Sequence, residues 1–413
     1  VLESKAGAKM RLLWTCDKYG KPVPPRGVQK PRFTRDWRDV VNDPHVDIVV
    51  ELIGGYEPAR TLVLAALKSR KHVATANKAL LAKYWGEMSV AAQQSGALLY
   101  FEAAVGGGIP VIQGINEGLA ANRIEKIYGI LNGTTNYILG RMTEDGMDFA
   151  AALKGAQEAG FAEADPTFDI EGIDAAHKLA VLASLASGAW IRLEDVTREG
   201  ISSLDVWDVH FARERLGMVT KLLGIVELGK DRFSARVHPT LIPGTHPFAN
   251  VPREYNAIFV HGDAAGDVMF YGKGAGQMAA SSAVVSDVIY LARQVANGTA
   301  GQIPYVTYNP AVQLKPIPFD QLQCRHYLRF TTVDRPGVLA QITRFLARQK
   351  VSISSVHQED TESALGAAVR GGVPIVVLTH KAPEGRVREA ARNIDRLAVV
   401  RRKTVHLRIE DSF

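Results

Sequence analysis

The stretch VDIVVELIGG, residues 46–55, is a largely apolar run rich in β-branched residues that ends in two glycines. A strand that is apolar on both faces is typical of a parallel sheet covered by helices on each side. Similar runs occur at residues 10–17, 72–77 and 97–105, and helix-like segments lie between them at residues 60–70 and 84–96. The alternation predicts an α/β domain over residues 1–115, in which ligands bind at the carboxyl ends of the strands.

Further along the chain, helices and strands mix without this alternation, which predicts an α+β domain over residues 116–305 whose end returns to the first domain. A proline-punctuated linker follows at residues 303–318. The tail, residues 325–413, has the order β-α-β-β-α-β of a small ferredoxin-like unit. Its expected elements are strands at 327–333, 351–360, 373–380 and 398–409 and helices at 338–350 and 384–395.

Charge and hydropathy exclude several classes of protein. The formal net charge is +6, and part of the excess lies in residues 385–403, where basic residues are spaced along a helix. A spaced basic face is usually solvated, and no zinc-finger or RNA-binding signature accompanies it, so we expect no nucleic-acid partner. The weakly polar stretch 179–191 is too short to cross a bilayer, so we expect no membrane segment.

Cysteine use points to a reducing compartment. The chain contains only Cys16 and Cys324. Without a second pair there is no basis for a disulfide framework or a thiolate metal site, and the sequence is interpreted as cytoplasmic.

The stretch GFAEADPTFDIEGIDAAHK, residues 160–178, concentrates carboxylates and ends on a lysine. By spacing alone it could be a solvated surface cluster, since Asp165-Pro166 suits a helix start and Asp174 with Lys178 is an i, i+4 pair. The stretch nevertheless resembles the signature of homoserine dehydrogenases that carry a C-terminal ACT regulatory domain. The matching positions are Ala156, Gly160, Phe161, Asp165, Pro166, Asp169, Gly172, Asp174 and Lys178.

The resemblance implies reversible hydride transfer between L-homoserine and NAD or NADP, giving L-aspartate 4-semialdehyde. It implies Lys178 and Asp174 as catalytic residues, with Lys178 exchanging the hydroxyl proton. A lysine does this only if its pKa is lowered or a water relays the proton. The substrate ammonium favours carboxylates. The resemblance therefore implies substrate contacts at Glu163, Asp169, Asp174 and Lys78. His177 is interpreted as structural, and LNGTTNYIL, residues 131–139, as part of the substrate cleft without individual roles.

The cofactor contacts implied by the resemblance are spread over the chain. They are Asp17, Gly54, Lys78, Gly160, Gly274 and Gly276. Asp17 ends a predicted strand and suits the ribose hydroxyls of NAD, whereas the adjacent Lys18 would tolerate the 2'-phosphate of NADP. The sequence therefore does not decide between NAD and NADP.

A Rossmann-type sheet usually opens with a strand and Gly-x-Gly-x-x-Gly at a helix N-terminus. No such motif precedes residue 11, and the chain starts on Val1, so we expect the first strand and the glycine loop to be missing. Because the first strand is central in the order 3-2-1-4-5-6, its absence predicts a gap in the sheet. The segment GKGAGQMA, residues 272–279, precedes a helix but lacks the strand-helix-strand context of a dinucleotide fingerprint.

The glycine-rich FEAAVGGGIP, residues 101–110, fits a simple turn or a carbonyl site for a monovalent cation. The resemblance implies a structural sodium ion held by Glu102, Val105, Gly107 and Ile109.

The tail is typical of ACT domains, and the resemblance implies an amino-acid effector such as threonine and a homodimer or a higher homo-oligomer. Two alternatives stay open beside the dehydrogenase. One is a regulatory or amino-acid-binding protein that has lost turnover together with its glycine loop. The other, a semialdehyde dehydrogenase with a cysteine nucleophile, is weak because Cys16 and Cys324 lie outside the expected catalytic domain.

Overall fold

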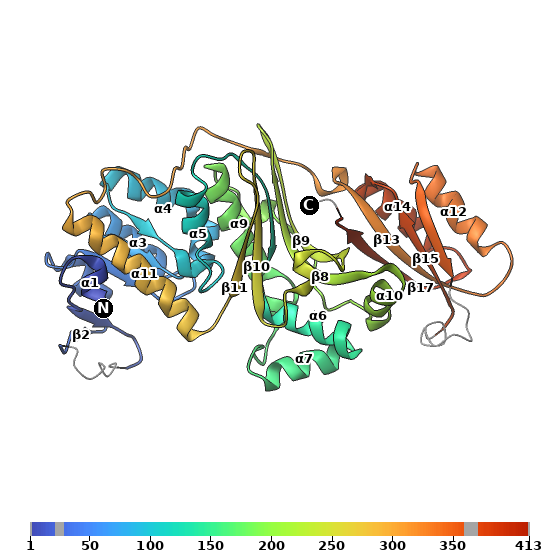
Figure 1. Ribbon diagram of the computed structural model, residues 1–413, viewed down its shortest axis with the longest axis horizontal. Coiled ribbons are helices and arrows are strands. Elements are labelled where there is room, and N and C mark those ends of the chain that lie inside the picture. Colours follow the sequence, from blue (N-terminus) through green and yellow to red (C-terminus); the bar gives the residue numbers. More distant parts are fainter. Residues whose placement is uncertain (1, 21–28, 359–370, 412–413) are drawn as a thin grey trace. The chain divides into compact units, whose positions relative to one another are not determined.

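The computed structural model describes residues 2–20, 29–358 and 371–411. The chain forms two compact units, each built from segments far apart in the sequence (Figure 1). The first unit contains residues 1–127, 177–195 and 257–314, and the second contains residues 128–176, 196–256 and 315–413. The domain boundaries near residues 115, 305 and 325 stay a prediction.

The first unit is an α/β arrangement. Its elements are α1 (Leu2–Ala6), β1 (Trp14–Cys16), β2 (Arg32–Thr34), α2 (Trp37–Asn42), β3 (Ile48–Glu51), α3 (Ala59–Lys68), β4 (His72–Thr75), α4 (Lys78–Ser95), β5 (Leu99–Tyr100), the 3-10 helices η1 (Glu102–Ala104) and η3 (Leu193–Asp195), α5 (Val111–Gln113), the π-helical turn η2 (Gly114–Gly118), β11 (Gly266–Lys273) and α11 (Gln277–Ala296). Three elements cross the boundary between the units: β6 (Ile124–Ile130), α9 (Ile173–Ser187) and β10 (Tyr255–Gly262).

The parallel sheet of the first unit is divided in two. β1 pairs with β2, and β3, β4 and β5 form a separate parallel sheet in that order. Among the residues that the structure describes, no strand joins the two sheets. This division agrees with the gap predicted for a Rossmann-type sheet that lacks its central first strand.

The observed elements of the first unit differ from the predicted ones in their bounds, and the strands expected at residues 10–17 and 46–55 are shortened to Trp14–Cys16 and Ile48–Glu51. The strand expected over residues 97–105 is reduced to Leu99–Tyr100, because the chain turns into η1 and then into the glycines. The helix-like segment at residues 84–96 is part of α4, and α4 begins at Lys78 as expected from that lysine's place after a strand, because Asn77 caps it through a hydrogen bond from the Leu80 amide.

The second unit is built on one sheet. Its elements are α6 (Gly133–Asp145), α7 (Phe149–Glu158), α8 (Thr167–Ile170), β7 (Thr197–Arg198), α10 (Val206–Leu216), β8 (Met218–Leu228), β9 (Arg232–Pro243), the 3-10 helices η4 (Pro247–Asn250) and η5 (Phe319–Gln321), β12 (Lys315–Pro316), β13 (Gln323–Thr332), α12 (Val338–Arg348), β14 (Ile353–Gln358), β15 (Val373–Thr379), β16 (Ala382–Pro383), α14 (Glu384–Ile394) and β17 (Val400–Ile409). Its main strands follow the order β8-β9-β17-β13-β15-β14.

The tail folds as a ferredoxin-like unit with the predicted order β13-α12-β14-β15-α14-β17. Its core includes Phe330, Ile342 and Val387, which are fully buried. Its last strand pairs in parallel with β9, with Arg408 opposite Thr240 and Ile409 opposite Leu241. The tail therefore shares a continuous sheet with the preceding part of the second unit. Residues 359 and 360 of the predicted strand 351–360 lie outside the described residues.

Candidate active site

The carboxylates of the signature stretch are organised by an asparagine. Asn132 follows β6 and caps α6, its side-chain oxygen accepting from the Thr135 amide at 2.8 Å. Its side-chain nitrogen donates to Asp169 Oδ1 at 2.7 Å and to Asp174 Oδ2 at 2.9 Å. Asn132 and Asp174 are buried, and Asp169 is half-buried. One amide group thus holds two carboxylates side by side.

The proposed catalytic lysine lies on the same helix as one of these carboxylates. α9 carries Asp174 in its first turn and Lys178 four residues later, a spacing that puts both side chains on one helix face. Lys178 is only 8% exposed, which is unusual for a lysine. The neighbouring His177 is also buried, in line with its structural interpretation.

The loop between α7 and α8 carries the remaining signature residues. Glu163 has an exposed side chain, and its backbone oxygen accepts from Gln157 Nε2 at 3.1 Å. Gly160 has a φ of 75°, a conformation that favours glycine. Thr134 of α6 donates its hydroxyl to the Phe161 oxygen at 2.7 Å. α6 therefore holds both this loop and the carboxylate pair.

Another residue of LNGTTNYIL is structural. Asn136 donates to the Arg253 carbonyl at 2.7 Å and accepts from Lys221 Nζ at 2.9 Å. Lys221 also donates to the Val251 carbonyl, at 2.9 Å. Burial lowers the pKa of Lys221 to about 8. Asn136 and Lys221 therefore fasten α6 to the segment before β10. The other asparagine of LNGTTNYIL, Asn132, is the one that contacts the carboxylates.

In the first unit, the structure brings together two expected cofactor residues. Glu51 at the end of β3 accepts hydrogen bonds from the amides of Ile53, at 2.8 Å, and Gly54, at 3.2 Å. Asn77, just before Lys78, donates to the Gly55 carbonyl at 2.8 Å. The turn with Gly54 and the helix start with Lys78 are thus held together at the carboxyl ends of β3 and β4. Sequence reasoning missed Asn77 and Glu51, although an asparagine directly before a helix is a recognisable cap signal.

Asp17 follows β1 and is exposed. Its Oδ1 accepts from the amides of Tyr19, at 2.6 Å, and Gly20, at 3.1 Å. These bonds lower its pKa, so the carboxylate is ionised over a wide pH range.

The predicted cofactor residues Gly274 and Gly276 lie beside the glycine-rich bend at residues 105–109. The Gly108 amide donates to the Lys273 carbonyl at 3.1 Å. A Cβ atom on Gly107, where φ is +56°, would lie 2.6 Å from the Gly274 oxygen. The bend and the loop before α11 are therefore in backbone contact that only glycine permits.

The carboxylate of Glu102 is fixed by backbone amides. Its two oxygens accept from Ile112 and Gln113, each at 2.9 Å, and its own amide donates to Asp287 Oδ2 at 2.9 Å. Burial is the main cause that raises the pKa of Glu102, and burial raises the pKa of Asp287 to about 8. Because amides already occupy the Glu102 carboxylate, a cation at this bend would use backbone carbonyl oxygens.

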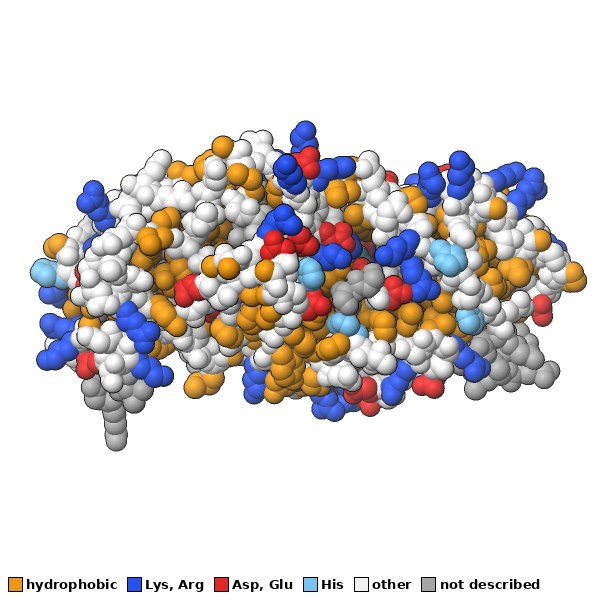
Figure 2. Space-filling view, turned by 45° about the horizontal axis from the view of Figure 1, so that its top comes forward, with side chains coloured by type: hydrophobic (Ala, Val, Ile, Leu, Met, Phe, Trp, Pro, Cys, Tyr) orange, Lys and Arg blue, Asp and Glu red, His pale blue; other side chains and the backbone are white. Residues whose placement is uncertain are grey.

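The surface carries charges of both signs. Figure 2 shows Lys and Arg side chains scattered over the visible face and interspersed with Asp and Glu. On that face the basic side chains are therefore not gathered in one patch. Within the described ranges, no helix combines the length and apolarity that a bilayer crossing requires.

Comparison with known proteins gives one consistent result. Family models match residues 2–102 (homoserine dehydrogenase, NAD binding domain), 110–289 (homoserine dehydrogenase) and 326–396 (ACT domain). The homoserine dehydrogenase of Pseudomonas aeruginosa is 43% identical over 397 residues, which cover 96% of this chain and 88% of that protein.

The solved structures that resemble this chain are also homoserine dehydrogenases. A homoserine dehydrogenase structure from Thiobacillus denitrificans matches with a TM-score of 0.89 and 42% identity, covering 99% of this chain and 92% of that one. A hyperthermophilic archaeal homoserine dehydrogenase mutant in complex with NADPH matches with a TM-score of 0.54 and 26% identity, covering 63% of this chain and 76% of that one.

Proposed function

This chain belongs to the homoserine dehydrogenase family, with an NAD(P)-binding domain and a C-terminal ACT domain, and we propose how its residues divide the work of that enzyme. The substrate of the proposal is L-homoserine, whose C4 alcohol is oxidised to the aldehyde of L-aspartate 4-semialdehyde. The single observation that carries the proposal is the pair of carboxylates, Asp169 and Asp174, held by Asn132, with Asp174 on the helix that also carries Lys178.

Lys178 exchanges the proton of the C4 hydroxyl. A neutral Lys178 Nζ, or a water bound to it, accepts this proton as the alcohol is oxidised, and the protonated amine returns it when the aldehyde is reduced. The position of Lys178 one helical turn after Asp174 supports this role, because it places both side chains on one face of α9. The bound nicotinamide supplies the hydride chemistry.

Asp169 and Asp174 bind the substrate ammonium. Two carboxylates held next to each other by one amide form an anionic site that a cation completes. Asp174 also contributes to the catalytic centre through its position one helical turn before Lys178. Glu163, exposed in the loop before α8, is the third proposed contact and joins the pair when substrate is present.

The cofactor lies along the first unit. Gly54 and Lys78 approach it from the turns after β3 and β4, Asp17 binds the adenosine ribose, and Gly274 and Gly276 contribute backbone. Gly160, which belongs to the second unit, is a further proposed contact. Lys18 is exposed beside Asp17 and can meet a 2'-phosphate. Lys18→Ala is therefore expected to lower kcat/KM with NADP more than with NAD.

A sodium ion is proposed at the carbonyl oxygens of Glu102, Val105, Gly107 and Ile109. The two buried carboxyls Glu102 and Asp287 support it, since a bound cation nearby would favour their ionised forms and offset the effect of burial on their pKa values. At constant ionic strength, sodium chloride should raise the thermal midpoint of unfolding relative to choline chloride. Equal midpoints in the two salts would contradict the site.

The ACT domain is proposed to bind an amino-acid effector such as threonine, and the enzyme to act as a homodimer or a higher homo-oligomer in the cytoplasm. Regulation requires that the effector prefer one of two states of the enzyme. Titration of threonine into the assay, with methionine for comparison, tests the effector. Sedimentation at several protein concentrations tests the oligomeric state.

The central experiment measures homoserine-dependent reduction of NAD and NADP by the 413-residue chain. Lys178→Ala should lower kcat by about 10²- to 10⁴-fold, the usual effect of losing a positioned acid-base group. Lys154→Ala is the matched control, because Lys154 is an exposed lysine on α7. A Lys178→Ala enzyme with unchanged kcat would refute the proposed role.

A further inference from the structure

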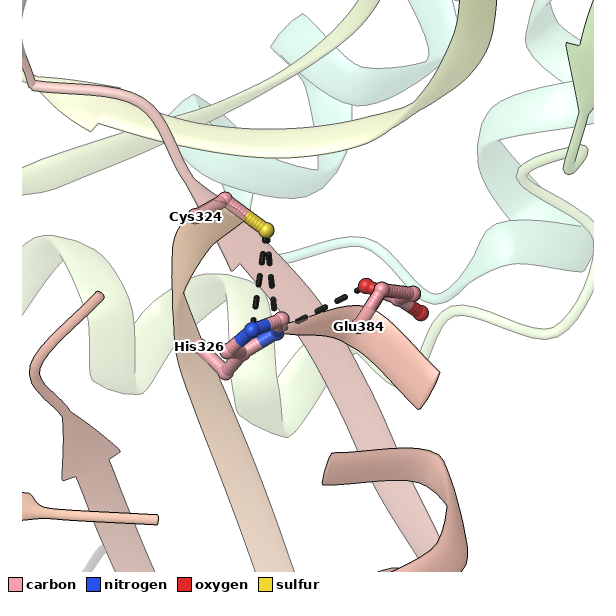
Figure 3. A group of neighbouring side chains, drawn as sticks. All are labelled: Cys324, His326 and Glu384. Carbon is pink, nitrogen blue, oxygen red and sulfur yellow. Dashed lines mark hydrogen bonds and ion pairs between the residues drawn. The ribbon is translucent and has the colours of Figure 1, made fainter. Parts of the chain in front are cut away.

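Outside the proposed active site, one group of side chains has the composition of a metal site. Cys324 and His326 lie two residues apart on β13, and Glu384 is the first residue of α14 (Figure 3). Ligand atoms of the three residues all lie within 4.8 Å of one another. His326 and Glu384 are buried, and Cys324 is half-buried.

A fourth donor comes from the neighbouring strand. His406 on β17 places its Nε2 2.9 Å from His326 Nδ1. The same His326 Nδ1 lies 3.8 Å from Cys324 Sγ and 3.7 Å from Glu384 Oε2. In a tetrahedral zinc site, metal bonds of about 2.0–2.3 Å place neighbouring ligand atoms roughly 3.3–3.6 Å apart. The three separations measured from His326 Nδ1 differ from these by at most about half an ångström, which side-chain rotation can supply.

The hydrogen bonds around His326 orient it as a ligand. His326 Nε2 lies 3.1 Å from the Ala382 carbonyl, which can only accept a hydrogen bond. The proton therefore sits on Nε2, which leaves a lone pair on Nδ1, the ring nitrogen that lies 2.9 Å from His406 Nε2. Cys324 Sγ lies beside the ring, 3.6 Å from Nε2 and 3.8 Å from Nδ1. A histidine fixed through its other nitrogen by a carbonyl is the usual arrangement beside a protein-bound metal.

The nearby charges balance a divalent cation. Glu384 is held by Arg408, with Nε to Oε2 at 3.1 Å and a second bond from Nη2 to Oε1. Arg408 is also paired with Glu199, Nη2 to Oε1 at 2.8 Å. The Arg408 and Glu199 charges cancel, so a cation of charge +2 would be neutralised by the Glu384 carboxylate and a Cys324 thiolate.

We propose that Cys324, His326, Glu384 and His406 form a structural site for zinc or a similar borderline-soft divalent cation, which ties β13, β17 and α14 of the ACT domain together. Binding breaks the Cys324 S–H bond, forms a sulfur–metal bond and releases the proton to solvent. All four positions are filled by protein, as in a structural rather than a catalytic zinc site.

Cobalt(II) serves as the probe, because a thiolate ligand gives it a charge-transfer absorption band in the near ultraviolet. The chelator-treated full chain should bind one Co²⁺ with this band, and one equivalent of Zn²⁺ should displace it. Cys324→Ser should abolish the band. Cys16→Ser should keep it, because Cys16 is the other cysteine of the chain and lies exposed in the first unit.

A third variant tests the histidine on the neighbouring strand. His406→Gln keeps a hydrogen-bonding partner for His326 but removes the imidazole donor. It should weaken cobalt binding by at least the roughly 10- to 100-fold that loss of an outer metal-site partner causes. Circular dichroism of the metal-free variants checks that they fold. A native chain without the band, a band that survives Cys324→Ser, or a band lost in Cys16→Ser would overturn the proposal.

Discussion

Asn132 and Asp174 are joined by a 2.9 Å hydrogen bond between two buried side chains that lie 42 residues apart in the sequence. The same amide nitrogen also donates to Asp169. Two carboxylates held this closely repel each other, and the asparagine offsets part of that repulsion in the substrate-free enzyme. The proposed ammonium site is therefore already assembled in the structure without substrate.

Replacing Asn132 by serine tests this arrangement. Serine still caps a helix but is too short to reach both carboxylates. Hydrogen bonds to charged groups contribute about 1.5–3 kcal/mol each, so Asn132→Ser should lower kcat/KM for homoserine by about 10- to 100-fold. Steady-state kinetics measure the loss. Asp148→Ser, a similar exchange at the cap of α7, should leave kcat/KM unchanged. Full activity in Asn132→Ser would show that the bridge is dispensable.

The contact between the glycine-rich bend and the loop before α11 predicts a steep local sensitivity. Gly107→Ala would place a Cβ atom 2.6 Å from the Gly274 oxygen at a φ of +56°, and should destabilise the fold by about 1–3 kcal/mol. Urea unfolding measures the change. Gly140→Ala is the control, because this helical glycine of α6 has open space where the methyl group would go. Equal stabilities of the two variants would contradict the contact.

The buried Lys221 predicts a dependence of stability on pH. Its pKa is about 8 in the folded protein and 10.5 in the unfolded chain, so between these values the unfolded chain binds a proton that the folded protein has released. The free energy of unfolding should therefore rise with pH across this window, by up to about 3 kcal/mol. Below the window both states are protonated and this contribution disappears.

Lys221→Gln isolates the effect, because glutamine retains donors for Asn136 and Val251 but does not titrate. The difference in unfolding free energy between the native chain and Lys221→Gln should grow from pH 8 to pH 10.5. A difference that stays constant over this range would rule out the lowered pKa.

A buried ion pair links the ACT domain to α10. Arg329 of β13 bonds Asp208 through Nε at 2.6 Å and through a second nitrogen at 2.7 Å, and both side chains are nearly inaccessible. Arg329→Met would leave a buried carboxylate without its cation and should destabilise the fold by about 3–5 kcal/mol. Chemical unfolding measures the loss, and the exposed Arg401→Met is the control.

The double variant Arg329→Met with Asp208→Asn separates charge from packing. If the uncompensated charge causes the loss, the double variant should be more stable than Arg329→Met alone. Additive effects of the two changes would instead assign the loss to packing.

Local patterns predicted the architecture because they depend on neighbouring residues. The apolar run at residues 46–55 and the β-α-β-β-α-β order of the tail are both present in the structure. The shortening of the strand at residues 97–105 could not be predicted, since it depends on where the Glu102 carboxylate finds its amide donors. The end of this strand is therefore set by contacts between segments that are distant in the sequence.

The site was predictable only in part for the same reason. Asp174 and Lys178 share a helix, and their spacing was visible in the sequence. The bond from Asn132 to Asp169 joins segments whose approach only the fold decides. The group around His326 is a stronger case. A sequence with two cysteines excludes a site made of several thiolates, but it gives no sign that Glu384 and His406 approach His326.

The parallel pairing of β17 with β9 has a consequence for how this enzyme could evolve. A regulatory module attached only by a flexible linker can be exchanged between genes as an independent piece. Here the last strand belongs to the same sheet as β8 and β9 and pairs directly with β9, with Arg408 opposite Thr240. Any transplanted module would have to present an edge in this register, so recombination is expected to retain or replace β9 and β17 together.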